Sequence, residues 1–304
     1  MSDKLSGVFP VFQTPFHEDD SIDYATLEKE LEWLIDRGSN GIVMAMVSET
    51  LRLSSEERDD LASKTCSIID RRLPVVISVG AECTHTAVRH TQHAEKSEAT
   101  AVMAIPPIAT NLGEQGLRTY YQSLIEAAHI PIIIQDASGY VGNAMSIELQ
   151  AELLNEFGPQ RILFKPEANP VGPKLSALRE ATNGQARVFE GSGGMALLDT
   201  YRRGIVGTMP GAEIIDAQVA FWNALENGDD LRASRLSEAI VSLVALQCHS
   251  LDGFLATEKH LLVRQGIFTN SRIRGPVSFE LDRESIKEVD RRFDRLQEIL
   301  QNDS

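Results

Sequence analysis

Short runs of apolar residues recur along the chain, and each is followed by a segment in which apolar positions have helical spacing. We distinguish eight such runs: GVFPVFQ (7–13), GIVMAM (41–46), PVVISVG (74–80), AVMAIPP (101–107), PIIIQD (131–136), RILFKPE (161–167), RVFEGSG (187–193) and GIVGTMPG (204–211). Nearly continuous apolar runs are typical of strands in a parallel sheet that is covered on both faces. The alternation of strands and helices therefore predicts a parallel α/β sheet.

The number of strand–helix units favours a closed barrel. Eight units within residues 7–211 fit a (β/α)8 TIM barrel. A doubly wound sheet is the alternative, but the dinucleotide signature GxGxxG does not follow the first strand. From about residue 215 the pattern is almost wholly helical. We therefore expect a catalytic barrel over residues 1–225 and a helical region packed on it over residues 226–304.

Two helix starts and one helix end can be located from capping residues. Ser21 or Asp23 can cap a first helix, and Gly38 is placed to end it. Ser54 or Ser55 can cap the next helix, where the acidic residues of LSSEER suit the positive helix end.

Composition narrows the classes of partner and compartment. The net charge of −15 argues against binding to nucleic acid or to an anionic membrane surface. Cys66, Cys83 and Cys248 are widely spaced and form no CxxC pair, which indicates reduced thiols. The chain starts without an apolar signal region and contains no apolar run near 18 residues. We expect a cytoplasmic protein without a membrane span.

Lys165 is the first candidate for chemistry, because it directly follows the apolar run Ile162 to Phe164. Glu167 is two residues further, so both side chains leave the strand on the same face. A lysine desolvated inside a barrel can lose its proton and attack a ketone to form a Schiff base. A plain buried ion pair is the alternative reading of the same two residues.

Other polar residues follow the predicted strands, at the end of the barrel where active sites form. The candidates for substrate binding are Ser48, Glu49, Thr50, Gln135, Asp136, Gly191 and Ser192. GSGG (191–194) lacks the lysine and spacing of a P-loop, so we interpret it as a turn lining the pocket. His85, His90 and His93 lie on a polar helix without a completing carboxylate pattern, so we expect solvent-exposed histidines and no metal site.

An ordered set of segments resembles one superfamily over essentially the whole chain. The segments are TPF (14–16), SETLRLSSEER (48–58), PVVISVG (74–80), GL (116–117), the Lys165 strand and ATEKHLLVRQGIFTNSRIRGPV (256–277). The chain is similar to the dihydrodipicolinate synthase and N-acetylneuraminate lyase superfamily of Schiff-base barrels. The resemblance implies that Lys165 is the Schiff-base lysine and Glu167 its catalytic neighbour, acting on a small 2-keto acid. It also implies a homo-oligomer, either a tetramer or a dimer.

The sequence departs from the synthases where they carry their proton relay. AMVSE (45–49) stands where the synthases have GTTGE, which leaves only the backbone N–H groups of Ser48 and Glu49 to bind a carboxylate. QDASGYVG (135–142) stands where they have YNVPGRTG, so Gln135 replaces the tyrosine and Tyr140 the arginine. The tyrosine pair after strand four is Ile108 and Ala109. We therefore do not expect the reaction of lysine biosynthesis, and we expect Tyr140 to line or close the pocket.

KPEANPVGPK (165–174), GSGG and RRGIVGTMPGAE (202–213) instead resemble the branch that contains L-2-keto-3-deoxyarabonate dehydratase. In that chemistry an imine at C2 acidifies C3, and the resulting enamine expels the C4 hydroxyl as water. The imine is the electron sink, so the resemblance implies no metal and no organic cofactor. A pyruvate-dependent aldolase or synthase of the same superfamily is the first alternative. A catalytically silent barrel that binds a keto acid is the second.

Overall fold

The computed structural model describes residues 5–138, 144–246 and 250–302. Eight strands run parallel to one another, in the sheet orders β2-β3-β4-β5-β6 and β1-β8-β7. They are β1 (Gly7–Val8), β2 (Ile42–Met44), β3 (Val75–Ser78), β4 (Ala101–Ala104), β5 (Ile132–Asp136), β6 (Ile162–Pro166), β7 (Phe189–Glu190) and β8 (Gly207–Thr208). Val11 bridges to Val43 and Gly211, and Phe164 bridges to Val188, so the two sheets close into one barrel.

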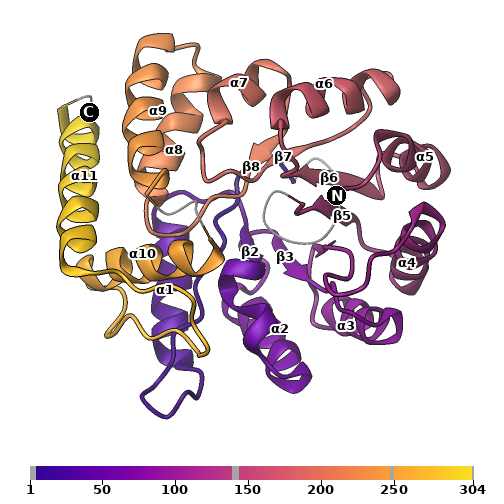
Figure 1. Cartoon of the computed structure of the whole chain (residues 1–304), viewed down its shortest axis with the longest axis horizontal. Coiled ribbons are helices and arrows are strands. Elements are labelled where there is room, and N and C mark those ends of the chain that lie inside the picture. Colours follow the sequence, from indigo (N-terminus) through magenta and orange to yellow (C-terminus); the bar gives the residue numbers. More distant parts are fainter. Residues whose placement is uncertain (1–4, 139–143, 247–249, 303–304) are drawn as a thin grey trace.

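Helices surround this barrel, as Figure 1 shows. They are α1 (Tyr24–Asp36), α2 (Ser55–Ile69), α3 (Thr84–Lys96), α4 (Glu114–Ala127), α5 (Ile147–Phe157), α6 (Val171–Ala181), α7 (Leu197–Arg202) and α8 (Ile215–Glu226). After them come α9 (Asp230–Val244), α10 (Leu251–Arg264) and α11 (Arg283–Asn302). The predicted (β/α)8 barrel with a C-terminal helical extension is confirmed. The division between residues 225 and 226 falls in the last turn of α8 and stays a prediction as a domain boundary.

The predicted helix boundaries follow from local hydrogen bonds. Of the two candidate caps of α1, Asp23 is the one whose side chain accepts a hydrogen bond from the Thr26 N–H. Of the two candidates at α2, Ser54 is the cap, and it forms a reciprocal capping box with Glu57. Gly38 ends the first helix with a φ of +86°, a left-handed conformation that glycine adopts without a steric penalty.

The strands divide their side chains between two separate hydrophobic clusters. The cluster inside the barrel contains Leu5, Phe9, Val11, Val43, Ala45, Val76, Ala101, Met103, Ile133, Leu163, Phe189 and Met209. Neighbouring strand residues such as Ile162 and Phe164 belong instead to the cluster between the strands and the helices. Because Leu163 faces the interior, Lys165, two residues further along β6, faces the interior as well. The continuous apolar runs of the sequence thus reflect burial on both faces of each strand.

Two predictions about side chains away from the barrel interior have different outcomes. The expectation of a solvent-exposed histidine is wrong for His90, which is 4% exposed and whose Nδ1 lies 2.6 Å from Asp59 Oδ1. Burial lowers the pKa of His90, and the Asp59 carboxylate from the adjacent α2 gives its ring a polar partner. Cys66 and Cys83 are free thiols, as predicted, while Cys248 lies outside the described residues.

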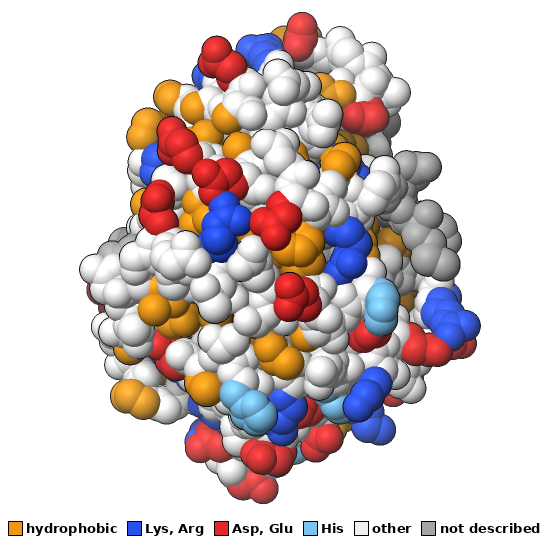
Figure 2. All heavy atoms as spheres, turned by 90° about the vertical axis from the view of Figure 1, so that its right-hand side faces the viewer, with side chains coloured by type: hydrophobic (Ala, Val, Ile, Leu, Met, Phe, Trp, Pro, Cys, Tyr) orange, Lys and Arg blue, Asp and Glu red, His pale blue; other side chains and the backbone are white. Residues whose placement is uncertain are grey.

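The exterior of the molecule carries charges of both signs. Figure 2 shows acidic and basic side chains interspersed on the face that lies at the right of Figure 1. Between α4 and α5, for example, Arg118 pairs with Glu152 and Glu156. Over the described ranges, no helix is both long and apolar enough to cross a membrane.

Candidate active site

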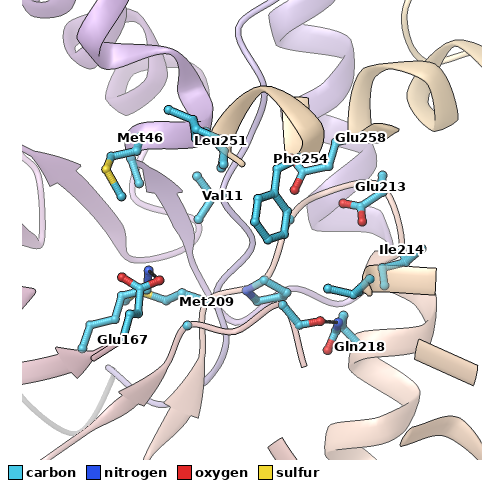
Figure 3. Close-up of a pocket in the computed structure, with 18 of the residues that line it drawn as sticks. Val11, Met46, Glu167, Met209, Glu213, Ile214, Gln218, Leu251, Phe254 and Glu258 are labelled. Carbon is cyan, nitrogen blue, oxygen red and sulfur yellow. Dashed lines mark hydrogen bonds and ion pairs between the residues drawn. The ribbon is translucent and has the colours of Figure 1, made fainter. Parts of the chain in front are cut away.

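A cavity opens at the carboxyl ends of the strands, where Figure 3 shows side chains from several elements converging. The space between its walls, with the open mouth included, amounts to about 720 Å³. Its reactive side is formed by Gln135, Lys165, Glu167 and Gly191. Apolar side chains, among them Met46, Val47, Met209, Leu251 and Phe254, form much of the remaining wall.

Lys165 and Glu167 form a buried ion pair at the bottom of this cavity. Lys165 Nζ lies 2.9 Å from Glu167 Oε1, and each side chain is 5% exposed. The other carboxylate oxygen, Oε2, accepts a hydrogen bond from Gln135 Nε2. Gln135 lies opposite Lys165 in the parallel register of β5 and β6, so the strand pairing itself brings the amide beside the carboxylate. The cluster places one amine and one carboxylate, held by an amide, against the same small volume.

Position 191 requires a glycine, because the Lys165 and Glu167 side chains leave no room for a Cβ atom there. A Cβ atom added at Gly191 would lie 2.6 Å from Lys165 Cε and 2.7 Å from Glu167 Oε1. Both distances are shorter than any ordinary contact of a real Cβ atom. The absence of a side chain therefore lets β7 approach the reactive pair.

The three predicted site residues after β2 point into the protein rather than into the cavity. Ser48 Oγ donates a hydrogen bond to the Phe12 carbonyl at 2.6 Å. The Glu49 carboxylate pairs with Lys259, and Thr50 is buried in the short helix η3 (Thr50–Arg52). The N–H groups of Ser48 and Glu49 close the turn of η2 (Met46–Ser48), so the idea that they bind a substrate carboxylate is not supported.

Asp136 and Ser192 also make structural contacts and are not part of the cavity lining. Asp136 Oδ1 accepts from the Ser138 N–H at 3.1 Å and Oδ2 from the Met145 N–H at 3.0 Å. Ser192 Oγ accepts from the Ala196 N–H at 2.8 Å and donates to Glu190, which shapes the turn after β7. As substrate contacts, both residues stay predictions.

Ile108 and Ala109, which stand where the synthases have a tyrosine pair, lie in the segment after β4. The backbone N–H groups of Ile108 and Ala109 both donate to the Glu82 carboxylate, at 2.6 and 3.0 Å. Tyr140, for which we expect a position at the pocket, lies outside the described residues.

Lys259 is a second buried lysine that the sequence analysis did not single out. Its side chain is fully buried, and burial lowers its pKa. Its Nζ is engaged by the Glu49 carboxylate, the Thr14 carbonyl at 2.8 Å and the Arg272 carbonyl at 2.6 Å. An amine with all of its hydrogens bonded, and outside the cavity lining, is a structural cation rather than a nucleophile.

Three polar residues of the cavity were also missed, namely Glu213, Gln218 and Glu258. Glu213 precedes α8, Gln218 lies on α8, and Glu258 lies on α10. Glu213 ends the segment RRGIVGTMPGAE and Glu258 lies within ATEKHLL, so both belong to segments that carry the family resemblance. The family resemblance therefore pointed to these two segments, but no local sequence pattern indicates that they meet in space.

The buried acids near the cavity do not form a metal site. Within the described ranges, no group of three or more His, Cys, Asp or Glu side chains is arranged to hold a metal ion. Burial instead raises the pKa of Glu258 well above its usual value, and the neighbouring Glu213 and Glu30 raise it further. The pKa of Glu30 is also raised well above its usual value by burial.

The chain is similar in sequence to two kinds of enzyme. L-2-keto-3-deoxyarabonate dehydratase from Azospirillum brasilense is 28% identical over 276 residues, which cover 89% of this chain and 88% of that one. 4-Hydroxy-tetrahydrodipicolinate synthase from Bartonella quintana is 32% identical over 177 residues, 58% of this chain. The match spans 60% of the Bartonella enzyme, and 52% of the synthase from Parabacteroides distasonis.

Solved structures share the fold along nearly the whole chain. The 4-hydroxy-tetrahydrodipicolinate synthase of Methylacidiphilum fumariolicum superposes with a TM-score of 0.88 at 23% identity, covering 98% of both chains. A prophage protein from E. coli K12, solved in complex with pyruvate, gives a TM-score of 0.87 at 20% identity, covering 96% of this chain and 99% of that one.

A family model matches the chain over residues 4–295, which include every element from β1 to most of α11. The chain belongs to the dihydrodipicolinate synthetase family.

Proposed function

We propose that the protein is a Schiff-base-forming lyase that dehydrates a 2-keto-3-deoxy sugar acid. The observation that carries the proposal is the buried Lys165–Glu167 pair, 2.9 Å apart, at the bottom of a small-molecule cavity. Lysine is a nucleophile suited to ketones, and a carboxylate beside it is suited to moving protons. The similarity to the Azospirillum dehydratase over 89% of the chain supports the choice of substrate class.

The proposed reaction begins at the keto group of the substrate. The Lys165 amine adds to C2, and loss of the C2 oxygen as water gives a protonated imine. Glu167 then removes a proton from C3, and the electrons of that C–H bond form the C2–C3 double bond of an enamine. The enamine expels the C4 hydroxyl, which takes a proton and leaves as water. Hydrolysis of the remaining imine returns the Lys165 amine and releases the dehydrated keto acid.

Gln135 distinguishes this mechanism from that of the synthases. Its amide donates to Glu167 and is neither an acid nor a base near neutral pH, so it holds the carboxylate rather than relaying a proton. Met46 and Val47 give the cavity apolar side chains at the positions of the two threonines.

Trapping with borohydride tests the nucleophile. Borohydride added with pyruvate or a 2-keto-3-deoxy acid should attach the carbon skeleton to Lys165, as read by peptide mass spectrometry. Lys174 and Lys259 are the controls within the same chain, because neither lines the cavity. Labelling at either of them, or no labelling at all, would refute the proposed nucleophile.

Product analysis tests the reaction. NMR of the protein incubated with separate keto-deoxy acids should show loss of water without cleavage of the carbon chain. Pyruvate plus an aldehyde would identify the aldolase alternative, and an unchanged substrate would identify a silent binding barrel. Condensation of pyruvate with aspartate semialdehyde should be negligible, because Gln135 replaces the tyrosine of the synthase relay.

A further inference from the structure

On the side that faces away from Lys165 and Glu167, the largely apolar wall of the cavity carries three polar side chains, two of them acidic. We call this side the distal wall and define it by Glu213, Gln218 and Glu258. Figure 3 shows Glu213 and Glu258 across the cavity from Glu167, with the Phe254 ring beside them. Gln218 lies on α8, the last helix of the barrel, and Glu258 lies on α10 of the C-terminal helical region, so the distal wall combines residues from both parts of the chain.

The two carboxyl groups are held together over Gly211. A Cβ atom added at Gly211 would clash with Glu213 Oε2 and with Glu258 Oε1, so the glycine makes room for both groups. Gln13 Nε2 donates a hydrogen bond to Glu258 Oε2 from behind. Glu258 is 3% exposed and Glu213 is 2% exposed, which excludes bulk water as their main partner.

Three buried acceptor atoms at or behind the distal wall lack a hydrogen-bond donor among the described residues. Gln218 is fully buried, and its Nε2 donates to the Gly193 carbonyl at 2.8 Å, but its Oε1 has no partner among the described residues. The same holds for Gln13 Oε1 and for Glu30 Oε2 in the layer behind. A buried polar atom without a partner is costly, and such atoms in a ligand cavity indicate a ligand that supplies the missing donors.

The charge of the distal wall restricts which chemical groups of a ligand can supply the missing hydrogen-bond donors. Among the described residues that line the cavity, Lys165 alone is a lysine or arginine, and it is paired with Glu167. A phosphate or carboxylate at the far end of a ligand would therefore meet acidic side chains and no cation. Neutral hydroxyl groups can both donate to the amide and carboxylate oxygens and accept from a protonated carboxyl group.

We infer that the distal wall binds hydroxyl groups at the far end of the substrate, so that the protein selects 2-keto acids with a neutral polyhydroxyl tail over those with a terminal phosphate or carboxylate. The inference rests on the proposed function, because it takes Lys165 as the anchor of the keto end. It assigns Glu213, Gln218 and Glu258 to substrate selection rather than to the chemical step.

Three six-carbon ligands with the same reacting carbons test this assignment. They are a 2-keto-3-deoxyhexonic acid, its 6-deoxy analogue and its 6-phosphate. The measurement is the ligand concentration that gives half-maximal borohydride trapping at Lys165, which does not require turnover. The 6-deoxy analogue should need a concentration roughly 10- to 100-fold higher, because it leaves buried acceptors without a donor. The 6-phosphate should also bind more weakly than the parent acid.

Glu258→Gln is the variant that tests the wall itself, and Glu30→Gln is its matched control. Both glutamates are buried and both have a raised pKa, but only Glu258 lines the cavity. Glu258→Gln replaces an acid by an amide that can donate to a phosphate, so it should bind the 6-phosphate several-fold more tightly than wild type. A gain of binding cannot come from partial unfolding. Glu30→Gln should leave the order of the three ligands unchanged.

Several outcomes would overturn the inference. They are equal trapping of the parent acid and its 6-deoxy analogue, tighter trapping of the 6-phosphate by wild type, or the same change of preference in Glu30→Gln as in Glu258→Gln. Pyruvate has no tail and separates the two proposals. If wild type traps pyruvate at Lys165 but does not discriminate among the tails, only the distal assignment fails. If pyruvate is not trapped, the Schiff-base function fails.

Discussion

Replacing Glu167 by glutamine separates a catalytic base from a plain ion-pair partner. The substitution keeps the length and shape of the side chain but removes its charge and its capacity to take a proton. In the structure, Glu167 Oε1 faces Lys165 Nζ at 2.9 Å and Oε2 faces Gln135 Nε2. Glutamine offers one acceptor oxygen to these two donors, so the Gln135 amide must turn over to satisfy both.

The structure allows two separate magnitudes to be estimated. Losing one charge-assisted hydrogen bond in a site where both side chains are 5% exposed should cost about 1.5–3 kcal/mol of unfolding free energy. Losing one general acid–base group should lower turnover by about 10²- to 10⁴-fold. That loss corresponds to a barrier increase of about 3–5 kcal/mol. The fold should therefore survive a change that nearly abolishes the reaction.

Three measurements on the same preparation distinguish the two roles. Turnover of a 2-keto-3-deoxy acid measures the whole reaction, and borohydride trapping at Lys165 measures formation of the imine. Exchange of the C3 protons with D2O, followed by NMR, measures the step that we assign to Glu167. Trapping should persist at a reduced rate, because the amine can attack without the carboxylate, while turnover and C3 exchange should fall together.

Glu190→Gln is the matched control for this experiment. Glu190 ends the adjacent strand β7 and is 2% exposed, but it bonds to Ser192 and Thr208 and does not line the cavity. A comparable loss of turnover in this control would show that any buried glutamate at the barrel end has the same effect. A folded Glu167→Gln variant that traps substrate and turns it over near the wild-type rate would remove Glu167 from the mechanism.

Three further substitutions should have distinct effects. Gly191→Ala should displace the Lys165 side chain, because the added Cβ would lie 2.6 Å from its Cε, and trapping should fall while circular dichroism stays that of a folded barrel. Glu49→Gln should cost about 3–5 kcal/mol in urea denaturation, because it leaves the fully buried Lys259 without its carboxylate. Burial raises the pKa of Glu30, so its contribution to stability is complete below the unfolded value near 4.5 and is lost as pH rises through the folded value. Glu30→Gln should remove that loss, a slope of up to about 1.4 kcal/mol per pH unit, in denaturation curves measured at increasing pH.

The sequence by itself determined those features that depend on neighbours along the chain. Continuous apolar runs indicated strands buried on both faces. Capping chemistry narrowed the helix starts to Ser21 or Asp23 and to Ser54 or Ser55, and the structure selects Asp23 and Ser54. The two-residue period of a strand placed Lys165 and Glu167 on one face, because that period is a property of the extended backbone. The sequence analysis proposed both Gln135 and Asp136 as substrate contacts, but adjacent strand residues face opposite sides, and the structure places Gln135 at the cavity and Asp136 in a loop contact.

Only the tertiary structure decided which distant residues meet. The register of β5 against β6 brings Gln135 to Lys165, and packing of α10 against the barrel brings Glu258 to Gln13, which is 245 residues away. A partner on an adjacent helix explains why His90 is buried although its own helix reads as polar. Such pairs leave no periodic trace in the sequence, because each residue is compatible locally with a solvated surface. Their burial becomes favourable only when the fold supplies the opposite charge or hydrogen-bond partner.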